Sequence, residues 1–256
     1  MSGALLQGML RNGLASPYLL GISAGSGLVI VFFISFSLVQ TFIPFAAWIG
    51  AILTTLIVFV LSKDGNKIVV ERLVLGGVAI SSLFGAIQAT LLLNAEDGRI
   101  QAALNWLIGS LNARGWQEIK FTALPILIAL FIGLFLYRQL NLLSLGDELS
   151  VSLGTSLFRS RCLIGAIATL LTACAVSIGG LIGFIGLIVP HFSRLLIGND
   201  FKYILPFSAL IGALTLSSAD LISRLGPIEI PVGIVTALLG APVFMFILYN
   251  RTNFKK

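Results

Sequence analysis

Residues 183–200 read GFIGLIVPHFSRLLIGND, an apolar run that ends abruptly in Pro190, His191 and Arg194. His191 is the only histidine of the chain. The change from apolar to polar is typical of a membrane span that meets water. Proline has no N–H to donate and ends or bends a helix, so the stretch predicts a short span whose polar end protrudes toward a partner.

The composition extends this interpretation to the whole chain. Hydrophobic residues make up 57% of it, charged residues 10%, and the mean hydropathy is +1.05. A soluble domain carries about 25% charged residues, so that class is excluded. The net charge of +6 comes from scattered basic residues, which argues against nucleic-acid binding. Cys162 and Cys174 lie in apolar sequence and are predicted to pack rather than to form a disulfide or bind a metal.

Uncharged runs define the predicted crossings. The stretch between Arg11 and Lys63 is long enough for two helices of about twenty residues, and the QTFIP sequence at 40–44 divides it. Four further runs each have about the length of one crossing. They are residues 73–95, 121–137, 203–219 and 230–250.

The stretch from Cys162 to Pro190 fits one long helix or two short ones broken near Ser177–Gly180. With two crossings, 12 of the 16 basic residues fall on one side of the membrane, whereas one crossing divides them evenly. The positive-inside rule therefore favours two short crossings. The total is eight complete transmembrane helices in an all-α polytopic membrane protein, with the C-terminus in the cytoplasm.

Three segments lie outside these crossings. The N-terminal stub MSGALLQGML is too short to cross, lacks a signal-peptide pattern, and is interpreted as the end of an inward-running helix. Residues 98–118 predict an interfacial helix on the outer surface. Residues 139–161 form the longest cytoplasmic connection, and their leucines predict short amphipathic helices that dock a partner. These leucines are Leu143, Leu145, Leu149, Leu153 and Leu157.

The residues also allow two other functions, an intramembrane protease and an ion-coupled carrier. Gly21-Ile-Ser-Ala-Gly25 fits G-x-S-x-G, so Ser23 with His191 could form an intramembrane protease, although the same glycines fit close helix packing. An ion-coupled secondary carrier would need carboxylates inside the membrane. Asp220 is the nearest example, and its place four residues before Arg224 indicates a local ion pair.

The chain contains no phosphate-binding loop, because no lysine follows a glycine. If ATP drives this protein, a separate subunit must bind it. The chain itself is then a transport subunit and not an enzyme.

Five motifs occur in order along the chain: QGMLRNGLASPYLLGIS at 7–23, GDELSVSLG at 146–154, GFIGLIVPHFSR at 183–194, ADLISR at 219–224 and PIEIPVGIVTALLGAPVF at 227–244. In sequence and spacing they resemble the iron-siderophore, haem and cobalamin permeases (FecCD type) of ABC importers. One departure is Gly13, where the family usually has a proline after Arg-Asn.

The resemblance implies a type II ABC importer permease fold of ten crossings that works as a homodimer or a related heterodimer in the plasma or inner membrane. Residues 1–256 are then a single permease domain that lacks the first crossing and most of the second. The implied partners are ATP-binding subunits and a substrate-binding protein. The cargo would be an iron chelate, most of all a siderophore, so no metal ligands and no cofactor are expected in this chain.

The resemblance also assigns roles to residues. ATPase coupling is implied for Gly146, Asp147, Glu148, Leu153, Gly154, His191 and Arg194, and none of these is catalytic. Arg224 matches a position that docks the binding protein. The structural motif positions are Arg11, Asn12, Pro190, Pro231, Gly233, Gly240 and Pro242.

Overall fold

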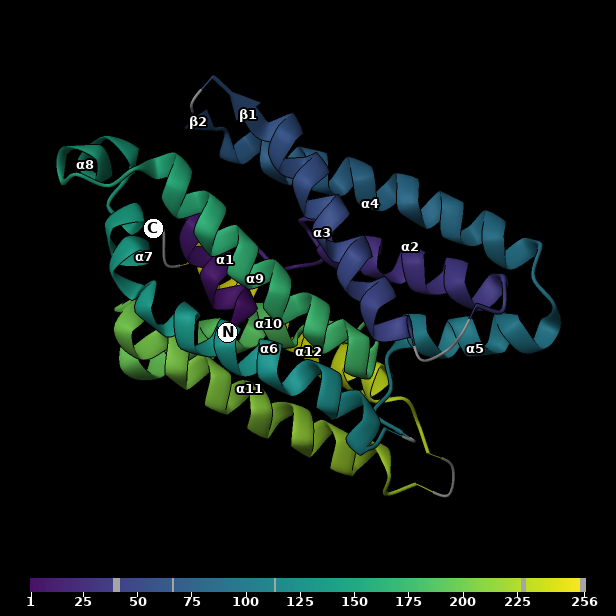
Figure 1. Cartoon of the computed structure of the whole chain (residues 1–256). Helices are drawn as coiled ribbons and strands as arrows, with labels where there is room; N and C mark the ends of the chain where they lie inside the picture. Colours follow the sequence, from purple (N-terminus) through teal and green to yellow (C-terminus); the bar gives the residue numbers. More distant parts are fainter. Residues whose placement is uncertain (39–41, 66, 113, 227–228, 254–256) are drawn as a thin grey trace.

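A computed structural model describes residues 1–38, 42–65, 67–112, 114–226 and 229–253, and twelve helices account for most of them (Figure 1). The all-helical class is therefore confirmed. A two-residue strand pair, β1 (Lys63–Asp64) and β2 (Lys67–Ile68), forms a small hairpin between two helices. The helices are α1 (Ser2–Leu10), α2 (Ile22–Ser35), α3 (Ile43–Ser62), α4 (Val70–Leu93), α5 (Asp97–Ile108), α6 (Trp116–Phe135), α7 (Tyr137–Ser144), α8 (Asp147–Ser152), α9 (Leu157–Gly179), α10 (Ile185–Ile197), α11 (Phe201–Ser223) and α12 (Val232–Asn253).

Within the described residues, five helices are long and apolar enough to cross a membrane: α3, α4, most of α6, α9 and α11. Shorter apolar helices occupy Ile22–Ser35, Ile185–Ile197 and Val232–Ile247. Large apolar side chains such as Val60, Leu75 and Leu214 point outward from the long helices. An outward apolar surface is what a lipid solvent requires and what water penalises.

The predicted break near residue 180 is confirmed, although only the second of the two helices is short: α9 has 23 residues and α10 has 13. Helix α9 ends at Gly179, and its C-cap Gly180 has φ 71°, in the region that glycine adopts without a steric penalty. Phe184 also has a positive φ, 65°, immediately before α10 begins. The chain therefore turns between residues 180 and 184 and does not continue as one long helix.

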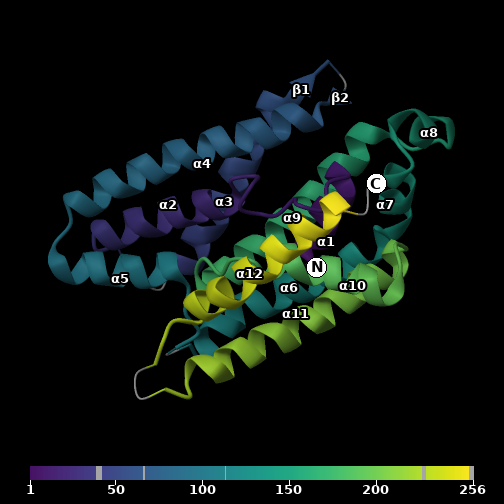
Figure 2. The same cartoon turned by 180° about the vertical axis from the view of Figure 1, so that it is seen from behind.

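Helix α1 occupies the centre of the molecule. All its residues from Gly3 to Leu10 are buried, and it packs against α9, α10, α7 and α11 (Figures 1 and 2). A helix that is apolar all round is stable only when neighbours cover every face. Helix α9 is the other strongly buried element, so α1 and α9 together form the core.

Two features bring α1 and α10 into close contact. Pro190 has no N–H to donate to the carbonyl of Gly186, four residues earlier in α10. Gly3 lies against that carbonyl, because a Cβ atom at residue 3 would overlap the oxygen of Gly186. Any larger side chain at Gly3 would therefore force the two helices apart.

A second glycine junction joins three distant segments by main-chain hydrogen bonds. The N–H of Ser110 donates to the carbonyl of Gly179 at 2.8 Å, and the N–H of Leu181 donates to Trp106 at 3.1 Å. The N–H of Gly233 donates to the carbonyl of Gly109 at 3.0 Å. The ends of α5 and α9 are thereby fixed to the start of α12.

The region between α4 and α6 differs from the predicted single interfacial helix over 98–118. Helix α5 ends at Ile108, and Gly109, with φ 83°, turns the chain. Helix α6 then begins at Trp116, because the carboxylate of Glu118 accepts a hydrogen bond from the N–H of Gly115 at 2.9 Å. This one-sided cap starts α6 five residues before the predicted uncharged run.

Candidate coupling site

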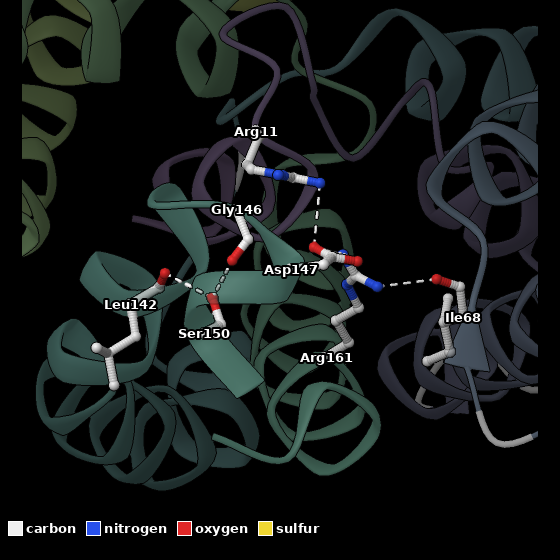
Figure 3. A network of polar contacts seen from close by, with 7 residues as sticks. All are labelled: Arg11, Ile68, Leu142, Gly146, Asp147, Ser150 and Arg161. Carbon is white, nitrogen blue, oxygen red and sulfur yellow. Dashed lines mark hydrogen bonds and ion pairs between the residues drawn. The ribbon is translucent and has the colours of Figure 1, made fainter. Parts of the chain in front are cut away.

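The connection between α6 and α9 contains the two short helices that the leucine spacing predicts. Gly146 precedes α8 with φ 107°, a conformation that favours glycine. The hydroxyl of Ser150 donates to the carbonyls of Leu142, at 2.7 Å, and of Gly146. These bonds hold α8 against the end of α7 (Figure 3).

Asp147, the first residue of α8, is the centre of an ionic network (Figure 3). Its carboxylate accepts hydrogen bonds from Arg161 at 2.8 and 3.0 Å and pairs with Arg11 at 3.0 Å. Arg161 also donates to the carbonyl of Ile68 in β2 at 2.9 Å. One carboxylate therefore connects α8 to the end of α1, the first turns of α9 and the hairpin.

The sequence interpretation named Asp147 but missed its main partner. Arg161 is only 2% exposed, and burying a guanidinium is costly unless a carboxylate and hydrogen-bond acceptors compensate it. In the sequence, Arg161 stands in FRSRC at the start of an apolar helix and counted only as loop charge. The available signal was an arginine placed where an apolar span begins, fourteen positions after an acidic residue.

The predicted apolar face of this connection exists, but with different members. Leu145, Leu149 and Leu153 are exposed by 53–60%, as expected for a docking surface. Leu143 and Leu157 are buried in the main hydrophobic core, so their assignment to the exposed face was wrong. Leu143 lies in the last turn of α7 and Leu157 is the first residue of α9, and both side chains pack into the core.

Three further coupling candidates, Glu148, Leu153 and Gly154, lie at the ends of α8. Glu148 is exposed beside Asp147, and its carbonyl accepts a bond from Ser152. Gly154 follows the C-cap Leu153 with φ 82°, and a Cβ at this position would meet nothing within 4 Å. Residues 153 and 154 therefore form an open corner at the surface.

His191 and Arg194 line a cavity of about 640 Å³ that lies beside this network. Arg194 donates to the side-chain oxygen of Gln7, and Gln7 donates to the carbonyl of Leu187 at 3.1 Å. Arg11 contributes to both the cavity wall and the Asp147 network. Arg11 therefore links the cavity to α8, because it lines the first and forms an ion pair with Asp147 of the second.

Asp200 attaches α7 to the start of α11. Its carboxylate accepts hydrogen bonds from the Asn141 amide at 2.7 Å and from the N–H of Lys202 at 2.9 Å. The bond from Asn141, followed by that from Lys202, holds the pKa of Asp200 below its usual value. Asp200 is therefore an anion at neutral pH and keeps α7 next to α11.

Arg224 caps the other end of α11, about 36 Å from Asp200 at 1.5 Å per residue. Its guanidinium forms two hydrogen bonds with Asp220, at 3.0 and 3.1 Å, which confirms the predicted local ion pair. These bonds raise the pKa of Arg224 above its usual value. The docking candidate and the coupling candidates therefore lie at opposite ends of the molecule.

The motif residues mark turns and close contacts. Arg11 ends α1 with φ 50°, and the Asn12 side chain accepts a bond from the N–H of Leu14. Gly240 faces Phe184, where a Cβ would lie 2.5 Å from the Phe184 Cβ. Pro231 immediately precedes α12, and Gly233 is its second residue, where a Cβ would overlap the carbonyl of Ile108. Pro190 and Pro242 lie inside α10 and α12.

The geometry gives the protease alternative no support. Ser23 is buried in α2, which packs against α3, α4, α5 and α9. His191 lies in α10, which packs against α11, α1 and α12.

Among the described residues, no group of three or more His, Cys, Asp or Glu side chains could hold a metal ion.

Comparison with known proteins agrees along almost the whole chain. It is 39% identical to the cobalamin import system permease protein BtuC of Halobacterium salinarum over 98% of this chain and 68% of that one. It is 41% identical to the Fe(3+)-citrate import system permease protein YfmE of Bacillus subtilis over 96% of this chain and 75% of that one. The hemin transport system permease protein HmuU of Yersinia pestis is 38% identical over 98% of this chain and 77% of its own length.

A solved structure of an inward-facing metal-chelate type ABC transporter superposes with a TM-score of 0.91 at 34% identity. The similarity covers 97% of this chain and 81% of that one. Residues 1–250 match the sequence model of the FecCD transport family. The predicted resemblance is therefore confirmed, and the chain belongs to the FecCD transport family.

Proposed function

We propose that this chain is the permease subunit of an ATP-driven ABC importer that moves an iron chelate, most of all a ferric siderophore, into the cell. The observation that carries the proposal is the Asp147 network beneath the exposed apolar surface of α8. Relatives with the same family pattern are named for cobalamin, Fe(3+)-citrate and hemin, each a metal held by an organic ligand. The shared chemistry supports a chelate as cargo.

Eight crossings follow if the three shorter apolar helices span the membrane together with the five long ones. The excess of basic residues on one side then supports a cytoplasmic position for α7, α8 and the end of α12. An ATP-binding subunit docks there on Leu145, Leu149 and Leu153. A second permease copy completes the transport pathway.

The network supplies a mechanism for coupling. ATP binding and hydrolysis in the partner displace α8, and Asp147 transmits that displacement to Arg11 and Arg161. Both arginines begin or end core helices, so the movement reaches α1 and α9 directly. Rigid, close-packed helices pass such movements on instead of absorbing them.

Uptake of radiolabelled iron, presented as a ferric siderophore to cells that express the importer, tests the proposal. We expect uptake to stop when the lysine of the partner's phosphate-binding loop is replaced, and to continue when a protonophore collapses the ion gradient. A secondary carrier would give the reverse result. Uptake that survives loss of the ATPase would overturn the proposal.

Arg224 offers a separate test at the other end of the molecule. Reversing its charge with Arg224→Glu should weaken docking of an acidic substrate-binding protein by about tenfold, the loss of roughly 1.4 kcal/mol. Asp220→Asn keeps the arginine and serves as the matched control. Titration of the binding protein onto the permease in nanodiscs measures both. Equal affinity of Arg224→Glu and the unchanged protein would remove Arg224 from the docking site.

A further inference from the structure

Arg161 joins α8 to the hairpin between α3 and α4 (Figure 3). One terminal nitrogen of its guanidinium, Nη2, donates to both carboxylate oxygens of Asp147, at 2.8 and 3.0 Å. The other terminal nitrogen, Nη1, donates to the carbonyl of Ile68 in β2 at 2.9 Å. A guanidinium is planar and rigid, so acceptors bound at its two ends keep a fixed relation to each other. The first turn of α8 and strand β2 are therefore linked through one side chain.

The link is costly to break. Arg161 is buried, and among the described residues its Nε has no hydrogen-bond partner. Asp147 and the carbonyl of Ile68 provide the hydrogen bonds that this part of the chain gives to the guanidinium. A buried guanidinium that loses either acceptor has no water to replace it. When α8 moves, we expect the guanidinium to follow Asp147 and the Ile68 carbonyl to follow the guanidinium.

The hairpin is suited to pass such a displacement on to two helices. Its strands pair antiparallel, with Lys63 opposite Ile68. The N–H of Val69, which precedes the first residue of α4, donates to the carbonyl of Ser62, the last residue of α3, at 2.9 Å. The end of α3 and the start of α4 are thus fixed to each other. A displacement of the Ile68 carbonyl therefore reaches both helices.

Helices α3 and α4 belong to a different part of the molecule from the main neighbours of α8. Helices α2, α3, α4 and α5 form one group, in which α2 packs against the other three (Figures 1 and 2). Helix α9 packs against α3 on one side and against α1 and α6 on the other. The main contacts of α8 are with α7 and α9. A link from α8 to the hairpin consequently extends its influence to the α2–α5 group.

We infer that Arg161 is a positioning residue for transport, which makes the hairpin, and with it α3 and α4, move together with α8. This rests on the proposed function, because it takes α8 as the element that the ATP-binding subunit displaces. Hydrogen-bond and ion-pair networks between packed helices can carry coupling of this kind. Arg11 leads from Asp147 to α1, and Arg161 adds a second route to the helices on the other side of α9.

Hydrogen–deuterium exchange of the whole importer in nanodiscs tests this inference, with nucleotide either absent or trapped in the ATP-binding subunit by ATP and vanadate. Backbone amides exchange when their segment opens, so the hairpin and α8 can be followed separately in one sample. In the unchanged protein we expect the exchange of both segments to depend on nucleotide. In Arg161→Met, α8 should still respond, whereas the hairpin should exchange about tenfold faster in both states, because its charge-assisted bond is lost.

Two further variants separate positioning from folding. Arg159→Met removes the same charge from an exposed position of α9 and should leave exchange of the hairpin within about twofold of the unchanged protein. Arg161→Lys keeps a positive charge beside Asp147 but offers one nitrogen in place of two. It should therefore restore thermal stability without restoring the response of the hairpin to nucleotide. This variant carries the test even if Arg161→Met does not fold.

Failure of this inference and failure of the proposed function give different results. A hairpin that responds to nucleotide in Arg161→Lys as in the unchanged protein would overturn the inference. A hairpin that stays silent in the unchanged protein while α8 responds would also overturn it, and ATP-driven uptake would still stand. Exchange in α8 that ignores nucleotide would contradict the proposed coupling surface, and the role of Arg161 would fall with it.

Discussion

Asp147→Ala is expected to lower the free energy of unfolding by about 3 kcal/mol and to abolish uptake. The change leaves Arg161 buried without its carboxylate, and breaking a buried ion pair from one side costs about 3–5 kcal/mol. The lower end of that range applies because the Asp147 side chain is 38% exposed. Denaturant titration of the purified chain measures the loss.

The neighbouring acid provides the matched control for Asp147. Glu148→Ala removes an exposed carboxylate from the same helix and should change stability by less than about 0.5 kcal/mol. The double variant Asp147→Ala/Arg161→Met also removes the buried charge and leaves only the 41% exposed Arg11 without its carboxylate, so part of the lost stability should return. Equal losses for Asp147→Ala and Glu148→Ala would show that the network does not hold α8.

Gly154→Leu is expected to reduce uptake by about tenfold or more while ATP hydrolysis by the partner continues. A side chain at residue 154 would point away from the permease, since nothing lies within 4 Å of its Cβ position. It would therefore occupy space on the proposed docking surface of the ATPase, and a loss of roughly 1.4 kcal/mol in docking corresponds to a factor of ten. Transport and hydrolysis are measured together in proteoliposomes.

Backbone strain must be separated from bulk at Gly154. Its φ of 82° disfavours leucine by about 1–2 kcal/mol whatever the surroundings. Gly154→Asn tolerates this conformation with a smaller side chain and should retain most uptake. If Gly154→Asn and Gly154→Leu fail equally, backbone strain cannot be the main cause, because asparagine tolerates this φ. Unchanged coupling in Gly154→Leu would remove this residue from the coupling site.

The helices could be predicted from the sequence because each depends on local pattern. Uncharged runs of sufficient length gave the apolar helices, and the glycines near residue 180 gave the break between α9 and α10. The leucine spacing between Asn141 and Arg161 predicted short amphipathic helices, although it gave neither their number nor which leucines are buried. The start of α6 was missed because Glu118 caps Gly115 before the apolar run begins.

Long-range partners could not be predicted in the same way. Nothing local in the sequence says that Arg161 reaches Asp147 and Ile68, or that Gly3 touches the carbonyl that Pro190 leaves without an N–H donor. These contacts depend on how the helices pack, which the period of hydrophobic residues does not determine. The family pattern identified the position of Asp147, and the structure supplied the reason for it.

The central position of α1 has a consequence for biogenesis. Among the described helices, α1 precedes all those that pack against it, and its neighbours α9, α10 and α11 are synthesised more than 140 residues later. During translation α1 must therefore wait beside the insertion machinery, or in lipid, until most of the chain has been made. Contacts of such large sequence separation form late and slowly. The core of this permease is consequently the last part to assemble, and the nascent chain depends longest on protection from misassembly.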